Sequence, residues 1–383
     1  PRVAAKCSCV LGRQAVRRQP RATGACEPVI TTALSCFAMR STLSEATDYE
    51  LVHADLLRFF PQLVRALGGE PRTMMLRLGI DPDGPSERPS SLNGRSWVTL
   101  LERAATELRC PDFGMRLARL QADGSVLGSM GAVMRSANTL GQAIDYVAQH
   151  YHAHSLAAHM HLERDRGDHS LFVSHEILMD GVPNRRQAIE QVLLLAHLNA
   201  IDITCGQARV REVQFRHRPL SSASTYRAHF GSPVRFDANE DGVVFSARDL
   251  RSPIARRDPR QYALATQTIA ARFGRVTPPM HARVRALLVR LIEDEDCSIT
   301  RICSRMEIHP RTLHRRLRAE GKSFEGIKDV VRRDLALRYI QETDHPLTVV
   351  AGKLGYAEQS VLTRSCARWF AATPSQLRSQ TAH

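Results

Sequence analysis

Side chains suited to contacting nucleic acid gather in a helical pattern near the C-terminal end of this chain of 383 residues. Over residues 310–320, Leu313 and Leu317 recur at a spacing of four, which predicts a helix with one buried face. Arginine is the commonest reader of guanine, and the major groove of DNA accepts an α-helix. We therefore predict that the outer face of this helix contacts DNA through Arg311, His314, Arg315 and Arg318. A basic helix can also be a merely solvated surface, so the prediction depends on the elements around it.

A second segment of this kind lies about 49 residues further along, over residues 358–370. Its predicted buried face carries Leu362, Cys366 and Trp369. The side chains that remain for the outer face, and that we predict to contact DNA, are Gln359, Ser360, Thr363 and Arg364. Some of them are expected to bind phosphate groups rather than base edges, because phosphates accept a large share of protein–DNA hydrogen bonds.

Each of these helices follows a shorter helical pattern and a turn, as in a helix-turn-helix unit. In the first unit, Ser298 predicts an N-cap, and His309-Pro310 ends one helix and begins the next. In the second unit, Leu347 opens a helix and Gly355 occupies the turn, where a positive φ is needed. The sequence thus predicts two helix-turn-helix units in an all-α C-terminal domain, residues 282–383.

A long helical pattern over residues 324–341 joins the two units, and a capping box of Thr373 and Gln376 begins the last helix. Three further basic side chains are expected to supply general electrostatic attraction to DNA: Lys322, Arg332 and Arg333. We predict that one monomer presents both recognition helices to successive segments of the major groove.

The stretch 347–378 closely resembles the DNA-binding domain of the AraC/XylS family of bacterial transcription regulators. The residues that carry the resemblance are Ala351, Leu354, Gly355, Tyr356, Gln359, Ser360, Arg364, Arg368, Trp369, Phe370, Thr373, Pro374, Ser375 and Arg378. Segments 127–143 and 230–236 resemble the ligand-sensing domain of one AraC-type subfamily. The resemblance implies a regulator of promoter DNA that works with RNA polymerase, more often by activation than by repression.

Four positions depart from the family pattern. Glu307 stands where the first turn usually has glycine, and His309 and Ala357 stand where capping residues are usual. Cys366 replaces an aromatic side chain of the core. A missing N-cap costs about 0.5–2 kcal/mol, so these departures bear on stability more than on DNA contact.

Charge is unevenly distributed along the chain. The net charge of +14 divides into +6 for residues 1–40, +2 for residues 41–280 and +6 for residues 281–383. A basic C-terminal domain suits a polyanion such as double-stranded DNA, because each neutralised phosphate releases a counterion. The nearly neutral middle region argues against a purely architectural DNA-binding protein, which has no need of a large second domain.

The middle region predicts a mixed α+β domain over residues 41–250, followed by a linker over residues 251–281. Helical spacing recurs at 97–109 and 186–203, and alternating segments with a polar turn at 165–168 predict an antiparallel hairpin. We expect this domain to bind a small-molecule effector and to form a homodimer. The alternative is control by a partner protein or by a metal ion. The sequence does not name the effector or the operator.

The alternative of control by a metal ion rests on a cluster of histidines that could serve as ligands. Imidazole is a common metal ligand, and on a strand His152 and His154 would share a face, as would His159 and His161. No cysteine or carboxylate stands at a supporting spacing, so the favoured interpretation is a polar sheet surface with no metal and no cofactor. An enzyme is also disfavoured, because the sequence holds no G-x-S-x-G, HExxH, phosphate-loop or dinucleotide-binding motif.

The remaining features bear on location. Nine scattered cysteines without a CxxC pair favour a reducing cytoplasm, where the protein would associate with the nucleoid. No apolar run approaches the ~18 residues of a membrane span. Residues 1–40 predict either a disordered basic arm or a non-native extension that precedes Met39.

Overall fold

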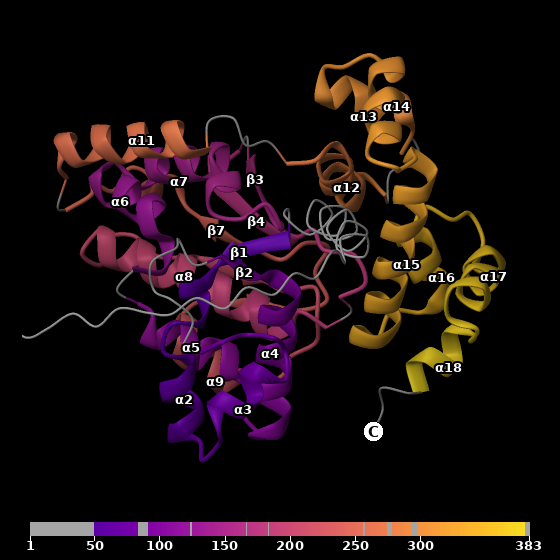
Figure 1. Ribbon diagram of the computed structural model, residues 1–383, viewed down its shortest axis with the longest axis horizontal. Coiled ribbons are helices and arrows are strands. Elements are labelled where there is room, and N and C mark those ends of the chain that lie inside the picture. The colour runs from indigo at the N-terminus through magenta and orange to yellow at the C-terminus, as the bar shows by residue number, and fades with distance from the viewer. Residues whose placement is uncertain are drawn as a thin grey trace, which may run out of the picture. The chain divides into compact units, whose positions relative to one another are not determined.

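Two hydrophobic cores divide the chain into an α+β N-terminal domain and a helical C-terminal domain (Figure 1). The computed structural model describes residues 50–379 except 83–90, 123–124, 166, 183, 256, 274–277 and 293–296. The predicted extension over residues 1–40 therefore lies outside the described residues. The two-domain architecture predicted from the sequence is confirmed.

The N-terminal domain combines helices with a small antiparallel sheet and a larger mixed sheet. Its helices before the main sheet are η2 (Ala54–Leu57), α2 (Phe60–Ala66), α3 (Pro71–Leu76), α4 (Gly94–Glu107), α5 (Phe113–Leu120), η3 (Ser125–Leu127), α6 (Gly128–Ser136), α7 (Leu140–Gln149) and η4 (Tyr151–Ala153). Between strands of the main sheet the chain forms α8 (Arg186–Ile203) and α9 (Ala223–Phe230), and after its last strand it forms α10 (Ala247–Leu250) and α11 (Pro259–Phe273). Strands β1 (Leu51–His53) and β2 (Ser91–Asn93) form the small sheet.

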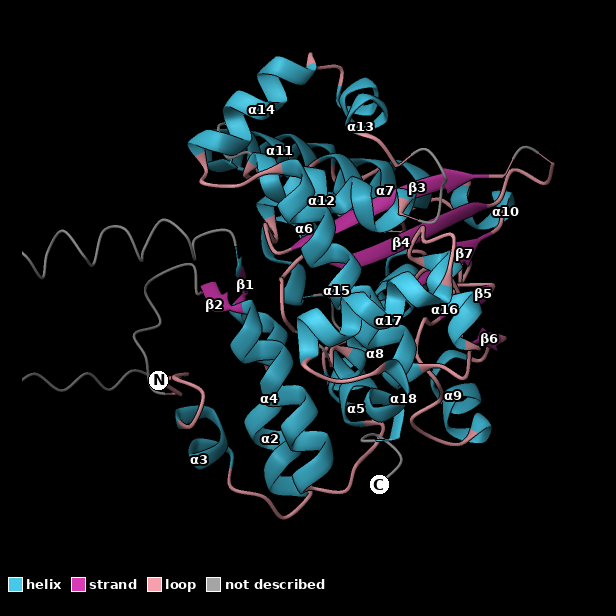
Figure 2. Cartoon of the chain, turned by 90° about the vertical axis from the view of Figure 1, so that its right-hand side faces the viewer, coloured by secondary structure: helices cyan, strands magenta, loops and turns pink. Residues whose placement is uncertain are grey.

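The main sheet has the strand order β3-β4-β7-β5-β6 (Figure 2). Its members are β3 (Ala158–Arg164), β4 (Leu171–Ile177), β5 (Glu212–Gln214), β6 (Val234–Arg235) and β7 (Gly242–Phe245). The predicted hairpin is confirmed, because β3 and β4 pair antiparallel from Ala158 opposite Ile177 to Arg164 opposite Leu171. Its turn is fixed by Asp165, whose Oδ1 accepts from the backbone amides of Gly167 and Asp168.

Helix α8 occupies the position that its periodicity predicts and crosses the centre of the domain. It is buried on most of its sides, which requires close neighbours. Gly114 of α5 allows one of them, since a Cβ there would lie 2.1 Å from the carbonyl oxygen of Gln187. The buried Gln191 of α8 is hydrogen-bonded: it accepts from Trp97 Nε1 at 3.1 Å and donates to the carbonyl of Leu56 at 2.8 Å.

The segment predicted as a linker, residues 251–281, contains helix α11. Figure 1 shows α11 beside α6 and α7. Ala265 and Ile269 of α11 are buried against Met130 and Val133 of α6. This part of the segment therefore packs on the N-terminal domain.

In the described part of the C-terminal domain, all the regular elements are helices. They are α12 (Met280–Leu291), α13 (Ile299–Met306), α14 (Pro310–Ala319), α15 (Phe324–Glu342), α16 (Leu347–Lys353), α17 (Gln359–Phe370) and α18 (Pro374–Ser379). The central helix α15 contributes Val331 and Leu335 to a core that also buries Leu313 of α14 and Leu362 of α17. Thr373 and Gln376 exchange hydrogen bonds at the start of α18, as the capping box predicts.

Two findings concern location and cysteine chemistry. Within the described ranges, no helix combines the length and the apolar character that a membrane crossing demands. No disulfide joins the described cysteines.

Candidate DNA interface and pocket

The first helix-turn-helix unit is α13, a turn and α14. Ser298 caps α13, with its Oγ accepting from the amide of Arg301 at 3.3 Å. Glu307 adopts φ +53°, so the turn needs the conformation that glycine would provide without strain. The expectation of a missing cap at His309 is wrong, because its Nδ1 accepts from the amide of Arg311 at 3.2 Å. An imidazole nitrogen can therefore replace the hydroxyl oxygen that usually satisfies this donor.

Helix α14 separates apolar from basic side chains sharply. Leu313 and Leu317 are buried, with 0% and 1% of their surfaces exposed. The four residues predicted to contact DNA are all exposed: Arg311, His314, Arg315 and Arg318. Within the described part of the chain, none of these four side chains forms a hydrogen bond or ion pair, so their donors are available to a ligand.

The second unit is α16, a turn and α17. Gly355 adopts φ +66° in the turn, as the sequence predicts. Glu358 is the N-cap of α17 and its side chain makes no capping hydrogen bond, so the second unit does lack a side-chain cap. Leu362 and Cys366 are buried, and Trp369 is half-buried with its Nε1 donating to Asp329 Oδ2 at 3.0 Å.

The outer face of α17 carries the second predicted set. Gln359, Ser360 and Arg364 are exposed, whereas Thr363 is half-buried. The Thr363 hydroxyl donates to the Gln359 carbonyl at 3.2 Å, and the Ser360 hydroxyl donates to Glu358 at 2.9 Å. Both hydroxyl oxygens still have acceptor capacity. Helices α14 and α17 thus each present polar side chains that are not consumed by the fold.

Arg332 of α15 supports the turn of the second unit. Its guanidinium donates to the carbonyl oxygens of Leu354 at 3.0 Å and Gly355 at 3.2 Å. The same group lies 4.6 Å from the ring centroid of Tyr356, a cation–π contact. The sequence predicted only general electrostatic attraction for Arg332. Its structural role was not visible there, because the turn that it contacts lies more than twenty residues away.

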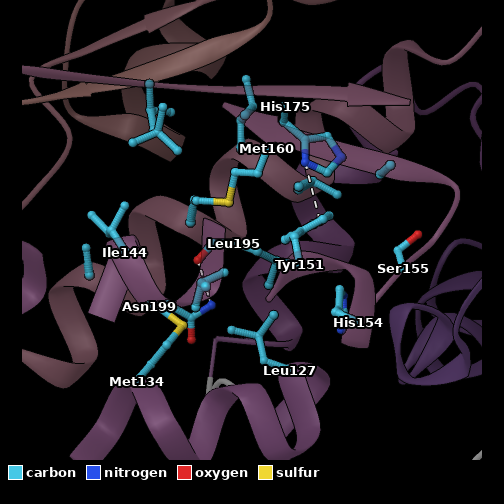
Figure 3. Close-up of a pocket in the computed structure, with 18 of the residues that line it drawn as sticks. Leu127, Met134, Ile144, Tyr151, His154, Ser155, Met160, His175, Leu195 and Asn199 are labelled. Carbon is cyan, nitrogen blue, oxygen red and sulfur yellow. Dashed lines mark hydrogen bonds between the residues drawn. The ribbon is translucent and has the colours of Figure 1, made fainter. Parts of the chain in front are cut away.

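The N-terminal domain encloses an apolar pocket of about 110 Å³ between the sheet and helices α7 and α8 (Figure 3). Its lining includes Ile144 of α7, Met160 of β3 and Leu195 of α8. Polar lining groups are few: Trp97, Tyr151, His154, Ser155, His175 and Asn199. Among the described residues of the lining, none is Asp, Glu, Lys or Arg.

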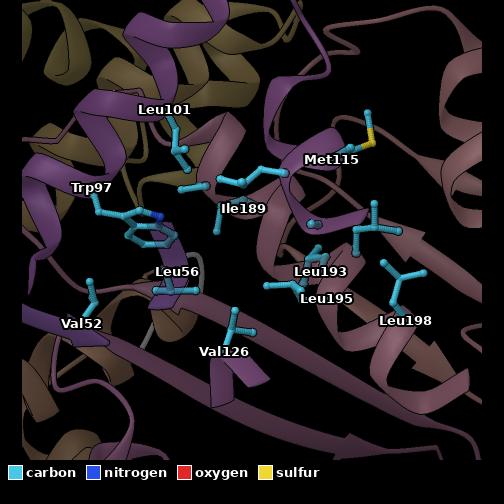
Figure 4. Packing of buried hydrophobic residues seen from close by; sticks show 14 of the residues in the cluster. Val52, Leu56, Trp97, Leu101, Met115, Val126, Ile189, Leu193, Leu195 and Leu198 are labelled. Atoms are coloured by element: carbon cyan, nitrogen blue, oxygen red, sulfur yellow. The ribbon is translucent and has the colours of Figure 1, made fainter. Parts of the chain in front are cut away.

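The pocket borders the main hydrophobic core. Val52, Leu56, Trp97, Leu193 and Leu195 belong both to the lining and to the core cluster that Figure 4 shows. A change in the pocket therefore acts directly on the packing of β1, α4 and α8.

The structure separates the histidines considered as metal ligands. His152 lies in η4 and His154 directly after it, so the expectation that they share the face of a strand is wrong. His154 lines the apolar pocket, whereas His159 and His161 alternate with the pocket residue Met160 along β3 and lie on the other face of the sheet. Among the residues that the structure describes, no group of three or more His, Cys, Asp or Glu side chains could hold a metal ion.

A buried ionic cluster links the pocket strand to the DNA-binding domain. His175 of β4 lines the pocket, and the next residue, Glu176, points to the opposite face. Glu176 pairs with Arg216, with Arg185 at 3.6 Å and with Arg338 of α15 at 3.5 Å. Burial alone would raise the pKa of Glu176, but these three guanidinium groups and that of Arg285 lower it to about 2.

A second contact joins the same two domains. The guanidinium of Arg285 in α12 lies between Asp180 and Asp334, with Nη2 2.9 Å from Asp334 Oδ2. Leu178 packs against Ala282 and Ala286 of α12. The end of β4 and the residues that follow it therefore contact both α12, the first helix of the C-terminal domain, and its central helix α15. Sequence reasoning missed Glu176, Arg285 and Arg338, because nothing in local spacing relates them.

Comparisons with known proteins agree with the assignment of both the N-terminal and the C-terminal domain. The family described as "Arabinose-binding domain of AraC transcription regulator, N-term" matches residues 68–254, and the family described as "Helix-turn-helix domain" matches residues 302–380. The chain is 33% identical to the HTH-type transcriptional regulator VirS of Mycobacterium tuberculosis over 328 residues, which cover 86% of this chain and 96% of VirS. It is 24% identical to the ornithine utilization regulator of Pseudomonas aeruginosa, covering 77% of this chain and 86% of that protein. Among solved structures it resembles the transcriptional regulator CdpR from Pseudomonas aeruginosa, with 21% identity, a TM-score of 0.38 and coverage of 82% and 97%.

Proposed function

Because this chain belongs to the AraC family of transcription regulators, we propose that one monomer binds a specific duplex site with α14 and α17 in successive segments of the major groove. The observation that carries the proposal is the pair of helices whose outer side chains are exposed while their leucines are buried. The 19-residue helix α15 connects the two units. A rise of about 1.5 Å per residue makes α15 roughly 28 Å long, which suits two sites about 34 Å apart on one face of DNA.

The side chains proposed to contact DNA are Arg311, His314, Arg315, Arg318, Gln359, Ser360, Thr363 and Arg364. Of these, we assign Arg315 and Arg364 to base edges, since arginine forms bidentate hydrogen bonds with guanine. The other contacts divide between bases and phosphates. The target is a promoter, and the protein acts there as an activator together with RNA polymerase, in the cytoplasm where the chromosome lies.

The N-terminal domain, proposed as residues 41–250, binds a small-molecule effector in the apolar pocket and mediates dimerisation. The description of its family as arabinose-binding supports a small-molecule effector. The position of His175 in the pocket and of Glu176 in the ionic cluster supports a direct route to α15. An effector that binds more tightly to one arrangement of these contacts shifts the equilibrium toward that arrangement.

Footprinting of the full chain on a selected duplex tests the DNA-binding proposal. The site is obtained by repeated selection from random duplexes, so that no operator needs to be known. We expect two protected major-groove segments per monomer, about one helical turn apart. The variant Arg315→Ala should lose one protected segment and Arg364→Ala the other. Protection of a single short segment by the unaltered chain would overturn the two-helix arrangement.

Control by a partner protein is the second candidate mode of regulation. Under this mode of regulation, no small molecule changes the affinity of the protein for its operator, and the DNA footprint is the same as in the first proposal. We propose no catalytic activity, since the similar proteins are transcription regulators.

A further inference from the structure

The chemical character of the pocket lining limits what it can hold. Most of the lining consists of aliphatic and thioether side chains from α6, α7, α8 and the sheet. Leu140, Leu193 and Phe245 are at most 2% exposed, so this surface is shielded from bulk water. A charged ligand would lose its hydration here without meeting a charged partner among the described lining residues, which is strongly unfavourable.

Three of the six polar lining groups are already hydrogen-bonded to other parts of the protein. Trp97 Nε1 donates to Gln191, and the Asn199 amide donates to the Leu195 carbonyl at 2.8 Å. The Ser155 hydroxyl accepts from the amide of Ala157 at 3.1 Å. These groups offer little to a ligand with many hydroxyls, and each unpaired buried hydroxyl would cost binding free energy.

One side of the pocket keeps hydrogen-bonding capacity. Tyr151, His154 and His175 gather there, opposite Ile144 and Met134 (Figure 3). The Tyr151 hydroxyl makes a long contact of 3.4 Å with His175 Nδ1. His154 stacks on His53 with ring centroids 5.8 Å apart. Burial lowers the pKa of His154 to about 3 and that of His175 to about 4, so both rings are neutral near pH 7.

We propose that the effector is a small, uncharged and largely hydrocarbon molecule whose single hydroxyl or carbonyl points toward Tyr151, His154 and His175. This proposal rests on the proposed function of the pocket as the effector site. The volume of about 110 Å³ lies below the roughly 150 Å³ of an apolar cavity that holds benzene, so the pocket admits nothing larger than a compact, monocyclic molecule. A sugar such as arabinose does not fit this chemistry, because its several hydroxyls would outnumber the available partners.

Four probes that differ in their polar groups test the proposal on the full chain: toluene lacks the hydroxyl of p-cresol, p-toluate carries a negative charge, and L-arabinose carries several hydroxyls. They are p-cresol, toluene, p-toluate and L-arabinose, titrated calorimetrically at pH 7.5. We expect p-cresol to bind most tightly and toluene about fivefold more weakly, the equivalent of one neutral hydrogen bond. The anion p-toluate and L-arabinose should show no binding at the same concentrations. Tighter binding of L-arabinose or of p-toluate than of p-cresol would overturn the proposal.

Matched variants locate the binding. Ala196 of α8 lines the pocket, so Ala196→Leu should fill it and weaken p-cresol at least tenfold. The control Ala263→Leu adds the same side chain at an exposed position of α11 and should bind p-cresol normally. Tyr151→Phe keeps the apolar walls and should bring p-cresol and toluene to equal affinity. Should Ala196→Leu fail to fold, Tyr151→Phe still decides: an unchanged ratio of the two affinities would contradict the proposed orientation.

The same samples are footprinted on the selected duplex. Intact DNA protection without p-cresol binding would refute the effector class and leave the proposed DNA-binding function standing. Loss of DNA protection by the unaltered chain would count against the proposed function itself.

Discussion

Exposure divides the arginines of the C-terminal domain into two groups. Arg311, Arg315 and Arg364 face solvent, where their donors can reach DNA. Arg332, which is half-buried, is bound by backbone carbonyls, and Arg338, which is buried, is bound by Glu176. Substitutions in the first group should act on DNA affinity alone, whereas those in the second should act on the fold or on the coupling of the domains.

The first prediction concerns base contacts. Arg315→Ala and Arg364→Ala should each weaken binding to the selected duplex by about 1–3 kcal/mol and relax base preference locally, as the loss of a bidentate contact does. The control Lys322→Ala removes an exposed charge outside the recognition helix and should weaken all sequences alike. Fluorescence anisotropy on matched and randomised duplexes measures both effects. An unchanged affinity of Arg315→Ala would show that α14 is misplaced in the groove.

The second prediction concerns Glu190, a fully buried carboxyl of α8. Burial raises its pKa to about 8, although it accepts a hydrogen bond from the Tyr226 hydroxyl. An unfolded glutamate titrates near pH ~4.3. The folded state therefore binds the extra proton between these values, so its stabilisation is complete below about pH 4.3 and is lost as the pH rises through 8.

Glu190→Gln should accordingly flatten the fall in the free energy of unfolding between pH 5 and pH 9, measured by urea unfolding of the full chain. The slope should not vanish, because burial also raises the pKa of Glu342, to about 7. Glu163→Gln, at an exposed position, should retain the original slope. Equal slopes for Glu190→Gln and the unaltered chain would exclude the assigned protonation.

At the scale of elements, the turn between α16 and α17 determines how the second recognition helix is presented. Gly355 adopts φ +66°, and a Cβ there would lie 2.5 Å from the carbonyl oxygen of Ile292. Gly321, after α14, adopts a similar φ of +64°, but nothing lies within 4 Å of its Cβ position. A comparison of the two glycines therefore distinguishes the cost of backbone strain, which both share, from the cost of a steric clash, which only Gly355 would meet.

The third prediction uses this pair. Gly321→Ala should destabilise the protein by about 1–2 kcal/mol, the cost of the left-handed conformation for an L-residue. Gly355→Ala should cost more, and should also remove the footprint of α17 while leaving that of α14. Denaturant unfolding and footprinting give the two readouts. If the two variants were equally stable, the close approach of Gly355 to Ile292 would be contradicted.

At the scale of the whole molecule, the described residues from 50 onward belong to one compact unit despite having two cores. Buried ion pairs of Glu176 with Arg338 and of Arg285 with Asp180 and Asp334 connect the cores. Removing one partner of a buried pair leaves the other charge without compensation, which is costly. The connection should therefore determine whether the domains unfold together.

The fourth prediction tests this connection with the two tryptophans, Trp97 in the N-terminal core and Trp369 in the C-terminal domain. Trp97→Phe and Trp369→Phe each leave one reporter. In these backgrounds both reporters should give the same urea midpoint. Adding Arg338→Ala should separate the midpoints, because Glu176 keeps Arg216 and Arg185 while α15 loses its ion pair with Glu176. The exposed control Arg364→Ala should leave the midpoints together, and coincident midpoints in Arg338→Ala would refute the coupling.

The fifth prediction is that a fragment from about residue 277 to residue 383 folds and binds DNA alone. Its core cluster contains only residues from Met280 to Leu377, so no apolar partner is lost apart from the contact of Leu178 with Ala282 and Ala286. We expect a cooperative thermal transition and the same two footprints, with weaker affinity than the full chain if residues 41–250 dimerise. A fragment without a cooperative transition would show that the domain boundary is misplaced.

The sequence alone determined the elements and the family. Helices 186–203 and 310–320, the hairpin turn at Asp165 and the cap at Ser298 follow from periodicity and from hydrogen bonds within a few residues. The DNA-binding candidates follow equally, because a helical face is a local property: once Leu313 and Leu317 point inward, Arg315 must point outward. These features depend on neighbours in the chain, which the sequence states directly.

Only the tertiary structure decided the pocket, the ionic cluster and the role of Arg332. The pocket joins η4, α7, α8 and the sheet, and Glu176 meets Arg338 across 162 positions of the sequence. The sequence left His154 as a less favoured candidate metal ligand beside His152, but packing places it in the apolar pocket and leaves His159 and His161 on the other face of the sheet. Burial and pairing of this kind arise when distant segments pack together, and no local pattern records which segments those are.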